Sequence, residues 1–325
     1  MEKILITGGA GYVGSVLTPY LLCHGYKIRV IDLFMYGDTL APHPNLEIIK
    51  GDIRDKNLLE KNLEGINIVI HLACISNDPS FELNPELGKS INLDAFPYLV
   101  DLAKQKKVEK FIYASSSSVY GIKTEKDVNE EMSLEPLTDY SKFKAECEKI
   151  LNNSKSSNFK VATIRPATVC GYSPRQRLDV IVNILTNLAY FKREITVFGG
   201  SQLRPNVHIL DMVRSYHHLI KTDFSKINGE IFNVGFENVS VDDLATTVKE
   251  ILGDDINIKR IPTNDNRSYH ISSQKIKKMI NFNTKFSIKS AIIDLKEAFK
   301  NKLITNTFED DSYYNIKVMN KINLK

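Results

Sequence analysis

The feature that most constrains the fold is a glycine-rich turn, Gly8–Gly14, which directly follows the short apolar run Lys3–Thr7. Its glycines have the spacing Gly-x-x-Gly-x-x-Gly. Between a strand and a helix, such glycines permit a tight turn, close approach of the backbone to a pyrophosphate, and close packing of helix on strand. The helix N-terminus also presents free N–H groups and a favourable dipole to phosphates. The turn therefore predicts a dinucleotide-binding site formed by Gly8, Gly11, Tyr12 and Val13.

Two aspartates extend this prediction. Asp32 ends the next apolar run, Lys27–Asp32, about 20 residues beyond the turn, where a carboxylate accepts hydrogen bonds from an adenosine ribose. The same carboxylate repels a 2′-phosphate, and no arginine follows it closely, which favours NAD over NADP. Asp52 follows the third run, Leu46–Lys50, and is expected either to bind the adenine amine or to cap a helix.

The first half of the chain alternates short β-branched runs with helical stretches. This alternation predicts an α/β fold of the Rossmann type, a doubly wound parallel sheet with right-handed crossovers. The predicted strands are Lys3–Thr7, Lys27–Asp32, Leu46–Lys50, Ile66–Leu72, Lys110–Ser115 and Phe159–Arg165, and the predicted helices are Gly11–His24, Asn57–Leu63, Pro85–Lys106 and Tyr140–Asn153.

The alternation breaks after Arg165, where Pro166, Gly171 and Pro174 indicate loops. We predict an NAD-binding domain over 1–172, to which 205–232 returns, and a smaller substrate-binding lobe over 173–204 and 233–325. The elements expected there are helices Leu178–Ala189, Val241–Leu252 and Ile288–Lys300 and strands Ile195–Phe198, Val207–Leu210 and Glu230–Val234. The polar tail beyond Ile304 is expected to be loosely ordered.

Composition argues against several classes of protein. The 325 residues are 42% hydrophobic and 25% charged, as in an ordinary globular protein. A net charge of +4 does not indicate a nucleic-acid partner, which needs a concentrated basic face. No apolar run approaches the roughly 18 residues of a membrane span, so no membrane contact is expected. The four scattered cysteines form no CxxC pair, so we expect no metal site or disulfide framework and a cytoplasmic location.

A second constellation points to chemistry. Tyr140 and Lys144 lie four residues apart at the start of a predicted helix and therefore share one face. A neighbouring ammonium favours tyrosinate, so the pKa of Tyr140 is expected to fall below the usual value of about 10. Such a tyrosine can exchange a proton with a substrate hydroxyl while a hydride moves. The run Ser115–Ser118 follows the fifth strand, and sites in this architecture form at strand ends.

With these motifs the chain resembles the extended short-chain dehydrogenase/reductases, in the NAD-dependent nucleotide-sugar epimerase/dehydratase family. The resemblance extends to about residue 300 and rests on Thr7–Gly14, Asp32, Gly51–Ile53, His71–Ala73, Asn92, Ser115–Gly121, Tyr140, Lys144 and Arg165–Thr168. It implies that Tyr140 is the general acid/base, Lys144 its activator and Ser116 the catalytic hydroxyl. The further cofactor-binding residues that it implies are Asp52, Ile53, Leu72, Ala73, Asn92, Ser115, Tyr140, Lys144 and Pro166.

The resemblance also bears on the reaction. The family's 4,6-dehydratases carry an Asp-Glu pair directly after the catalytic Ser/Thr, whereas Ser117 and Ser118 stand here. We therefore predict a nucleotide-sugar epimerase that removes a hydride from the sugar C4 and returns it. The alternative is a one-way C4 dehydrogenase or 4-ketoreductase. A non-catalytic NAD sensor or scaffold is a third hypothesis, against which the presence of both Tyr140 and Lys144 argues.

The expected partner is a nucleotide-diphosphate sugar whose base and sugar are left open. Guanidinium groups suit a diphosphate because their planar fork matches phosphate oxygens. By the resemblance, Arg204 and Arg267 match positions that hold the diphosphate. The predicted substrate-binding residues are Ser116, Tyr140, Arg177, Asn183, Arg204 and Arg267. The resemblance further implies a homodimer through the helices that follow Asn92 and that span Tyr140–Leu151.

Overall fold

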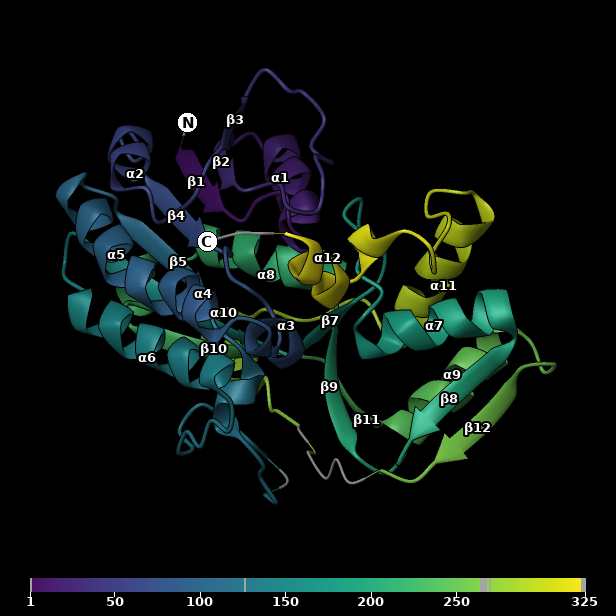
Figure 1. The fold of residues 1–325 in the computed structure, drawn as a ribbon. Helices are drawn as coiled ribbons and strands as arrows, with labels where there is room; N and C mark the ends of the chain where they lie inside the picture. Colours follow the sequence, from purple (N-terminus) through teal and green to yellow (C-terminus); the bar gives the residue numbers. More distant parts are fainter. Residues whose placement is uncertain (1, 126, 264–267, 269, 323–325) are drawn as a thin grey trace.

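A parallel sheet covered by helices on both faces dominates the molecule, and a smaller lobe of helices and short strands lies beside it (Figure 1). The computed structural model describes residues 2–125, 127–263, 268 and 270–322. The sheet has seven parallel strands in the order β10-β6-β5-β4-β1-β2-β3, which confirms the predicted fold class. Its strands are β1 Lys3–Thr7, β2 Lys27–Asp32, β3 Leu46–Lys50, β4 Ile68–His71, β5 Lys110–Ala114, β6 Lys160–Pro166 and β10 Glu230–Val234.

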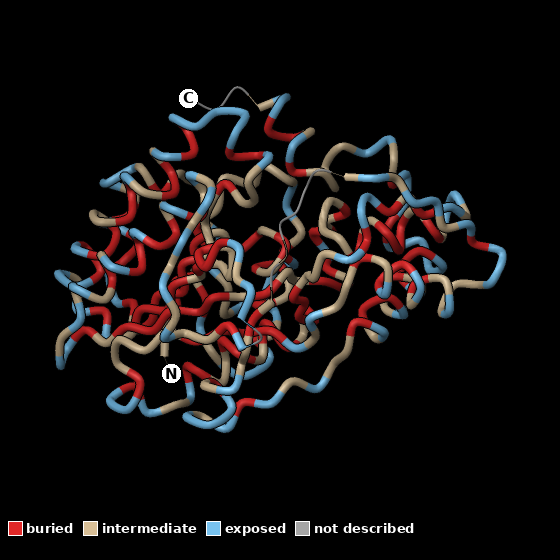
Figure 2. Tube along the Cα trace, turned by 90° about the horizontal axis from the view of Figure 1, so that it is seen from below, coloured by how far each residue is buried: buried red, intermediate tan, exposed pale blue. Residues whose placement is uncertain are grey.

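The inner strands are apolar, and both of their faces are buried. Ile4 and Ile6 of β1 pack in one apolar cluster, whereas Leu5 between them packs in a second cluster on the opposite face. The first cluster includes residues of α1 Gly14–Cys23, α8 Ile209–Lys221 and α10 Gln274–Ile280, and the second includes residues of α2 Lys56–Asn62, α5 Ala95–Gln105 and α6 Asp139–Ser154. Figure 2 shows buried segments concentrated in the interior between these layers.

The second lobe has two small sheets and its own apolar cluster, to which α7, α9 and α11 contribute. One sheet has the order β11-β9-β7 and the other pairs β12 with β8. These elements are β7 Thr168–Cys170, α7 Ile181–Lys192, β8 Glu194–Phe198, β9 Leu203–His208, β11 Glu237–Ser240, α9 Val241–Leu252, β12 Asn257–Ile261 and α11 Ile288–Lys300. Short 3-10 turns occupy Ser117–Tyr120, Phe224–Lys226 and Asp311–Tyr313.

The helix predicted over Pro85–Lys106 is interrupted. The structure has α4 over Pro85–Lys89, a π-helical turn over Ser90–Asp94 and then α5. A π-helical turn disturbs the regular helix ladder and often accompanies a functional site. A further short helix that the sequence analysis does not predict, α3 Asp78–Glu82, precedes this segment.

The strand predicted at Val207–Leu210 is wrong at its end, because α8 begins at Ile209. The buried side chains of α8 recur at helical intervals, with Met212, Val213 and Tyr216 on the face toward the sheet. The short apolar stretch at 207–210 resembles a strand, whereas the helical period becomes visible only over the longer segment.

The expectation of a loosely ordered tail is also wrong. The tail contains α12 Asn315–Lys321, whose Val318 and Met319 are buried, and Met319 joins the same apolar cluster as Leu5. Lys317 and Lys321 both pair with Asp311. Tertiary packing orders this segment even though its own sequence is largely polar.

A buried ion pair joins the helical layer to the sheet. Arg165 of β6 donates to both carboxylate oxygens of Glu148 on α6, at 3.0 and 2.7 Å. Ser115 also donates to Glu148, and Arg165 donates to the Tyr120 hydroxyl at 2.8 Å. Tyr120 in turn donates to Asn233 of β10 at 2.8 Å. One network thus fixes α6, β6, β10 and the loop that follows β5.

We expect the substitution Glu148→Gln to lower the free energy of unfolding by about 3–5 kcal/mol, because it leaves the buried Arg165 guanidinium without its counter-ion. Urea denaturation followed by circular dichroism measures the change. Glu146→Gln is the matched control on the same helix, since Glu146 is exposed and its ion pair with Lys149 is solvated. Equal stabilities of the two variants would contradict the assigned role of the buried pair.

Candidate active site

The site is a cavity of about 510 Å³ at the carboxyl ends of the parallel strands, where ligands bind in open α/β sheets. Most residues that the sequence analysis assigned to a site line this cavity. They are Gly8, Gly11, Tyr12, Val13, Asp32, Asp52, Ile53, Leu72, Ala73, Ser115, Ser116, Tyr140, Lys144, Pro166, Arg177 and Arg204.

The glycine turn has the shape of a phosphate cradle. Gly8 has φ +75°, and a Cβ atom on it would lie 2.6 Å from the Ala73 backbone nitrogen. A Cβ atom on Gly14 would lie 2.5 Å from the Gly8 carbonyl oxygen, so both positions require glycine. Helix α1 begins here, and no side chain caps its first N–H groups. A glycine turn of this form at a helix N-terminus fits the pyrophosphate of a dinucleotide.

Asp32 is held at the end of β2 by two backbone groups. Its carboxylate accepts from the Ala10 N–H at 2.9 Å and from the Phe34 N–H at 2.8 Å. Burial raises the pKa of Asp32 above its usual value, although these two hydrogen bonds oppose the shift. Asp32 thus presents a fixed, partly buried acceptor to the cavity.

Asp52 lines the same end of the cavity but already has a partner. The Arg54 guanidinium donates to its carboxylate oxygens at 2.7 to 3.1 Å. Burial raises the pKa of Asp52, but the hydrogen bonds from Arg54 outweigh it and leave that pKa below the usual value. Asp52 does not cap α2, because Asp55 accepts from the Leu58 N–H in that role.

Tyr140 and Lys144 lie one turn apart near the start of α6. This helix begins with a capping box, in which Thr138 accepts from the Ser141 N–H and Ser141 accepts from the Thr138 N–H. The Lys144 ammonium donates to the Ala114 carbonyl at 2.7 Å and lies 5.8 Å from the centre of the Tyr140 ring. The cap and this hydrogen bond fix both side chains at the end of β5.

The expected lowering of the tyrosine pKa is not found. Burial raises the pKa of Tyr140 above its usual value, and the nearby Cys74 and Asp78 add to the shift. The charge of Arg177 and a hydrogen bond with Ser116 oppose it. The spacing of Tyr140 and Lys144 carries no information on the burial of the ring, and burial disfavours the charged form.

Two predicted site residues do not line the cavity. Asn183 is fully buried, donates to the Tyr12 hydroxyl at 3.0 Å and to the Arg177 carbonyl at 2.8 Å, and accepts from the Gly171 N–H. Asn92, in the π-helical turn, forms hydrogen bonds with both the N–H and the C=O of Ile75. Both amides therefore form hydrogen bonds with residues that line the cavity, without lining it themselves. Arg267 lies outside the described residues.

The cavity also contains residues that the sequence analysis did not assign. Tyr36, Cys74, Ser76, Arg175 and Asn315 all line it. Arg175 stands two residues before Arg177 in one loop, and the sequence offers both guanidinium groups as candidates for a diphosphate, although only Arg177 is predicted to bind the substrate. Asn315 lies far along the chain in the polar tail, and no local pattern indicates its place.

The chain belongs to the NAD dependent epimerase/dehydratase family, whose model matches residues 4–235. This finding confirms the predicted family and the predicted cofactor, NAD.

Among curated relatives, the uncharacterized protein y4nG of Sinorhizobium fredii is 36% identical over 62% of this chain and 48% of its own length. A dTDP-D-glucose 4,6-dehydratase of Dictyostelium discoideum is 32% identical over 72% of this chain and 58% of its own length. The chain thus spans about half the length of these two relatives. A UDP-glucose 4-epimerase of Lactobacillus helveticus is 27% identical over 78% of this chain and 83% of its own length.

Solved structures agree in fold over nearly the whole chain. The UDP-glucose 4-epimerase of Thermotoga maritima with UDP-glucose has a TM-score of 0.85 at 25% identity and covers 93% of this chain and 100% of its own. MoeE5 in complex with UDP-glucuronic acid and NAD has a TM-score of 0.79 at 26% identity, covering 92% and 99%. In the part of the chain that the structure describes, no helix is long and apolar enough to cross a membrane.

We expect Asp32→Asn to weaken NADH binding about tenfold or more and to reduce the discrimination against NADPH. The reason is that a hydrogen bond to a charged group contributes about 1.5–3 kcal/mol, and the charge itself repels a 2′-phosphate. Nicotinamide fluorescence titrations give both dissociation constants. Asp38→Asn, an equal charge change at an exposed position in the following loop, serves as control. An unchanged NADH to NADPH preference in Asp32→Asn would contradict the assignment.

Proposed function

We propose that this chain is an NAD-dependent nucleotide-sugar epimerase that acts at the sugar C4. The observation that carries the proposal is that Ser116, Tyr140 and Lys144 share one cavity with the glycine turn. When bound, NAD supplies a nicotinamide ring that accepts and returns a hydride. The glycine cradle and Asp32 fit its pyrophosphate and adenosine ribose.

In this proposal Tyr140 takes and returns the proton of the sugar hydroxyl. Burial disfavours its phenolate, so proton transfer depends on the groups that stabilise the charged form. These groups are the Ser116 hydroxyl and the Arg177 guanidinium. Lys144, whose ammonium is tied to the Ala114 carbonyl, positions the end of β5 and adds positive charge beside the ring.

The side chains after Ser116 favour oxidation and reduction over elimination of water. Ser117 and Ser118 line the cavity where the family's 4,6-dehydratases carry an acidic pair. Ser118 is hydrogen-bonded to Ser116 through its hydroxyl at 2.8 Å and its N–H at 3.1 Å, so these serines order the loop. A C4 dehydrogenase or 4-ketoreductase would use the same three catalytic residues and is the alternative.

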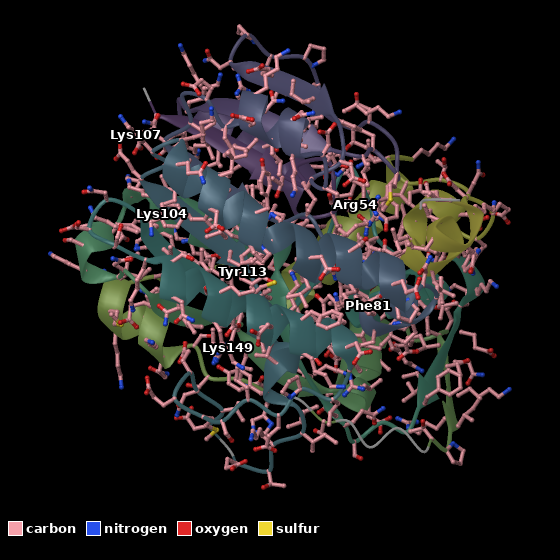
Figure 3. All side chains as sticks on the ribbon, turned by 60° about the vertical axis from the view of Figure 1, so that its left-hand side comes forward. Arg54, Phe81, Lys104, Lys107, Tyr113 and Lys149 are labelled. Atoms are coloured by element: carbon pink, nitrogen blue, oxygen red, sulfur yellow. The ribbon has the colours of Figure 1, made fainter. Side chains whose placement is uncertain are left out.

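The proposed substrate is a nucleoside diphosphate sugar, with Arg177 and Arg204 facing its diphosphate. Relatives named UDP-glucose 4-epimerase and dTDP-D-glucose 4,6-dehydratase support this substrate class. The proposal keeps the predicted division into an NAD-binding domain and a substrate-binding lobe, and the cytoplasmic location. The predicted homodimer would form across α5 and α6, the helices that Figure 3 views face on, with Lys104 on α5 and Lys149 on α6.

We expect Tyr140→Phe to lower turnover by about 10²–10⁴-fold, because it removes the proton-transfer group. NAD should remain bound, which mass spectrometry of the purified protein can measure. Tyr190→Phe, a substitution in the second lobe away from the cavity lining, is the matched control. Full activity in Tyr140→Phe would exclude the proposed mechanism.

An epimerase needs no external redox partner, whereas a dehydrogenase does. We therefore expect protein with bound NAD, without added coenzyme, to convert one nucleotide sugar until the two C4 epimers reach equilibrium. Candidate substrates come from a ligand-stabilisation screen of UDP-, GDP-, CDP- and dTDP-sugars, and proton NMR identifies the product. Steady accumulation of NADH in proportion to the sugar consumed would contradict epimerisation and favour the dehydrogenase.

A further inference from the structure

The C-terminal segment follows α11 of the second lobe and ends in α12, whose first residue, Asn315, lines the cavity. Figure 1 shows α12 lying over the middle of the molecule beside α3, against which it packs. The main chain of this segment is hydrogen-bonded to the loop that carries Arg175 and Arg177, two of the arginines that line the cavity. The Leu178 N–H donates to the Tyr313 carbonyl at 2.9 Å, and the Asn315 N–H donates to Asp179 at 2.8 Å.

Asn315 connects several groups of the cavity wall. It is only 2% exposed, and its side chain accepts from Arg175 Nη2 at 2.5 Å and donates to Ser76 Oγ at 2.8 Å. Asp179, which accepts from the Asn315 backbone, also pairs with Arg177 at 2.5 Å. Asn315 therefore contacts Arg175 directly and contacts Arg177 through Asp179.

Arg175 is a buried cation with an incomplete set of partners. It is 3% exposed, and its guanidinium lies 3.6 Å from the centre of the Tyr36 ring. Among the described residues no hydrogen-bond partner reaches its Nε atom. A buried N–H of this kind is costly unless a ligand or water accepts from it. Within the described residues, its side chain donates to the neutral amide of Asn315.

The surroundings of Arg175 indicate which kind of ligand would accept a hydrogen bond from its Nε atom. Its backbone N–H donates to the Ser15 hydroxyl in the first turn of α1, at 3.3 Å, so the main chain of Arg175 lies beside the start of this helix. Burial and the neighbouring charge of Arg177 lower the pKa of Arg175 to about 10, so it remains protonated at neutral pH. A buried cation with an unfilled N–H donor, in a cavity that the glycine turn before α1 also lines, suits a phosphate.

We propose that Arg175 is a phosphate-binding residue of this cavity, that its ligand is the diphosphate of a bound nucleotide, and that Asn315 positions it from the C-terminal helix. The diphosphate can belong to the coenzyme or to the sugar nucleotide. Binding measurements without turnover distinguish the two sources, so this inference can fail or stand independently of the proposed sugar chemistry.

The test titrates ADP, UDP and adenosine into the wild type and Arg175→Met by calorimetry. We expect affinity for a diphosphate to fall about 10- to 100-fold, with adenosine binding unchanged, because adenosine lacks the phosphates. A loss for ADP assigns Arg175 to the coenzyme diphosphate, and a loss for UDP assigns it to the sugar nucleotide. Either result supports the proposal, whereas unchanged affinity for both ADP and UDP overturns it.

Matched variants separate phosphate binding from structural damage. Arg260→Met, at an exposed arginine paired with Asp242, should change none of these affinities. Arg175→Lys keeps the charge but lacks the planar fork, and an intermediate loss for the diphosphate is expected. If Arg175→Met does not fold, Arg175→Lys carries the test alone, and full diphosphate affinity in it overturns the proposal.

The positioning role of Asn315 has its own readout. Asn315→Ala should weaken diphosphate binding about 3- to 10-fold without changing adenosine binding, and Asn320→Ala on the exposed side of α12 should not. In the double variant with Arg175→Met, removing Asn315 should cost nothing further, because it acts through Arg175. Additive losses, or equal losses for adenosine, would assign Asn315 a merely structural role.

Discussion

The geometry of the site depends on the buried ion pair between Glu148 and Arg165. Tyr140, Lys144 and Glu148 follow one another at intervals of four residues along α6, so a single helix face carries both the proposed chemistry and its anchor. The pair is shielded from water, and its two charges are satisfied only by each other and by Tyr120 and Ser115. Because Ser115 precedes Ser116, the anchor also fixes the loop that carries the hydroxyl next to Tyr140. A buried pair of this kind adds little net stability but strongly penalises any other arrangement of its elements.

A second constraint, steric rather than electrostatic, sets the opposite wall. The backbone at Gly8 approaches the backbone at Ala73 so closely that no side chain fits between β1 and the loop after β4. That loop is held from its other side by Asn92 through the backbone of Ile75. The glycine turn and the loop after β4 therefore contact each other directly, and both line the cavity. This arrangement explains why Asn92 supports the site without lining the cavity.

The fold and much of the site could be predicted because their signals are local. Each strand of the large sheet is a short apolar run, and the glycine turn, Asp32 and the Tyr140/Lys144 pair are patterns within a few residues. The failures at the tail and at the pKa of Tyr140 share a cause, which is that the decisive contacts join distant parts of the chain. The tail is ordered by packing on α3 and by the loop at Arg175, neither of which its own composition reveals. The raised pKa of Tyr140 likewise reflects burial by surrounding elements, which the interval between Tyr140 and Lys144 cannot express.

The cations of the cavity link binding to chemistry. Lys144, Arg175 and Arg177 line one cavity together with Arg204, and Arg177 pairs with the carboxylate of Asp179. Bringing like charges together in a low-dielectric site is unfavourable, so the fold must hold them there through the Ala114 carbonyl, Asn315 and Asp179. Fixing them before a ligand arrives means that little reorganisation is needed when negative charge enters the site. The same positive field also opposes the effect of burial on Tyr140, since Arg177 favours its phenolate. The tail, by holding the loop of both arginines, therefore acts on diphosphate binding and on the proton-transfer residue through one set of hydrogen bonds.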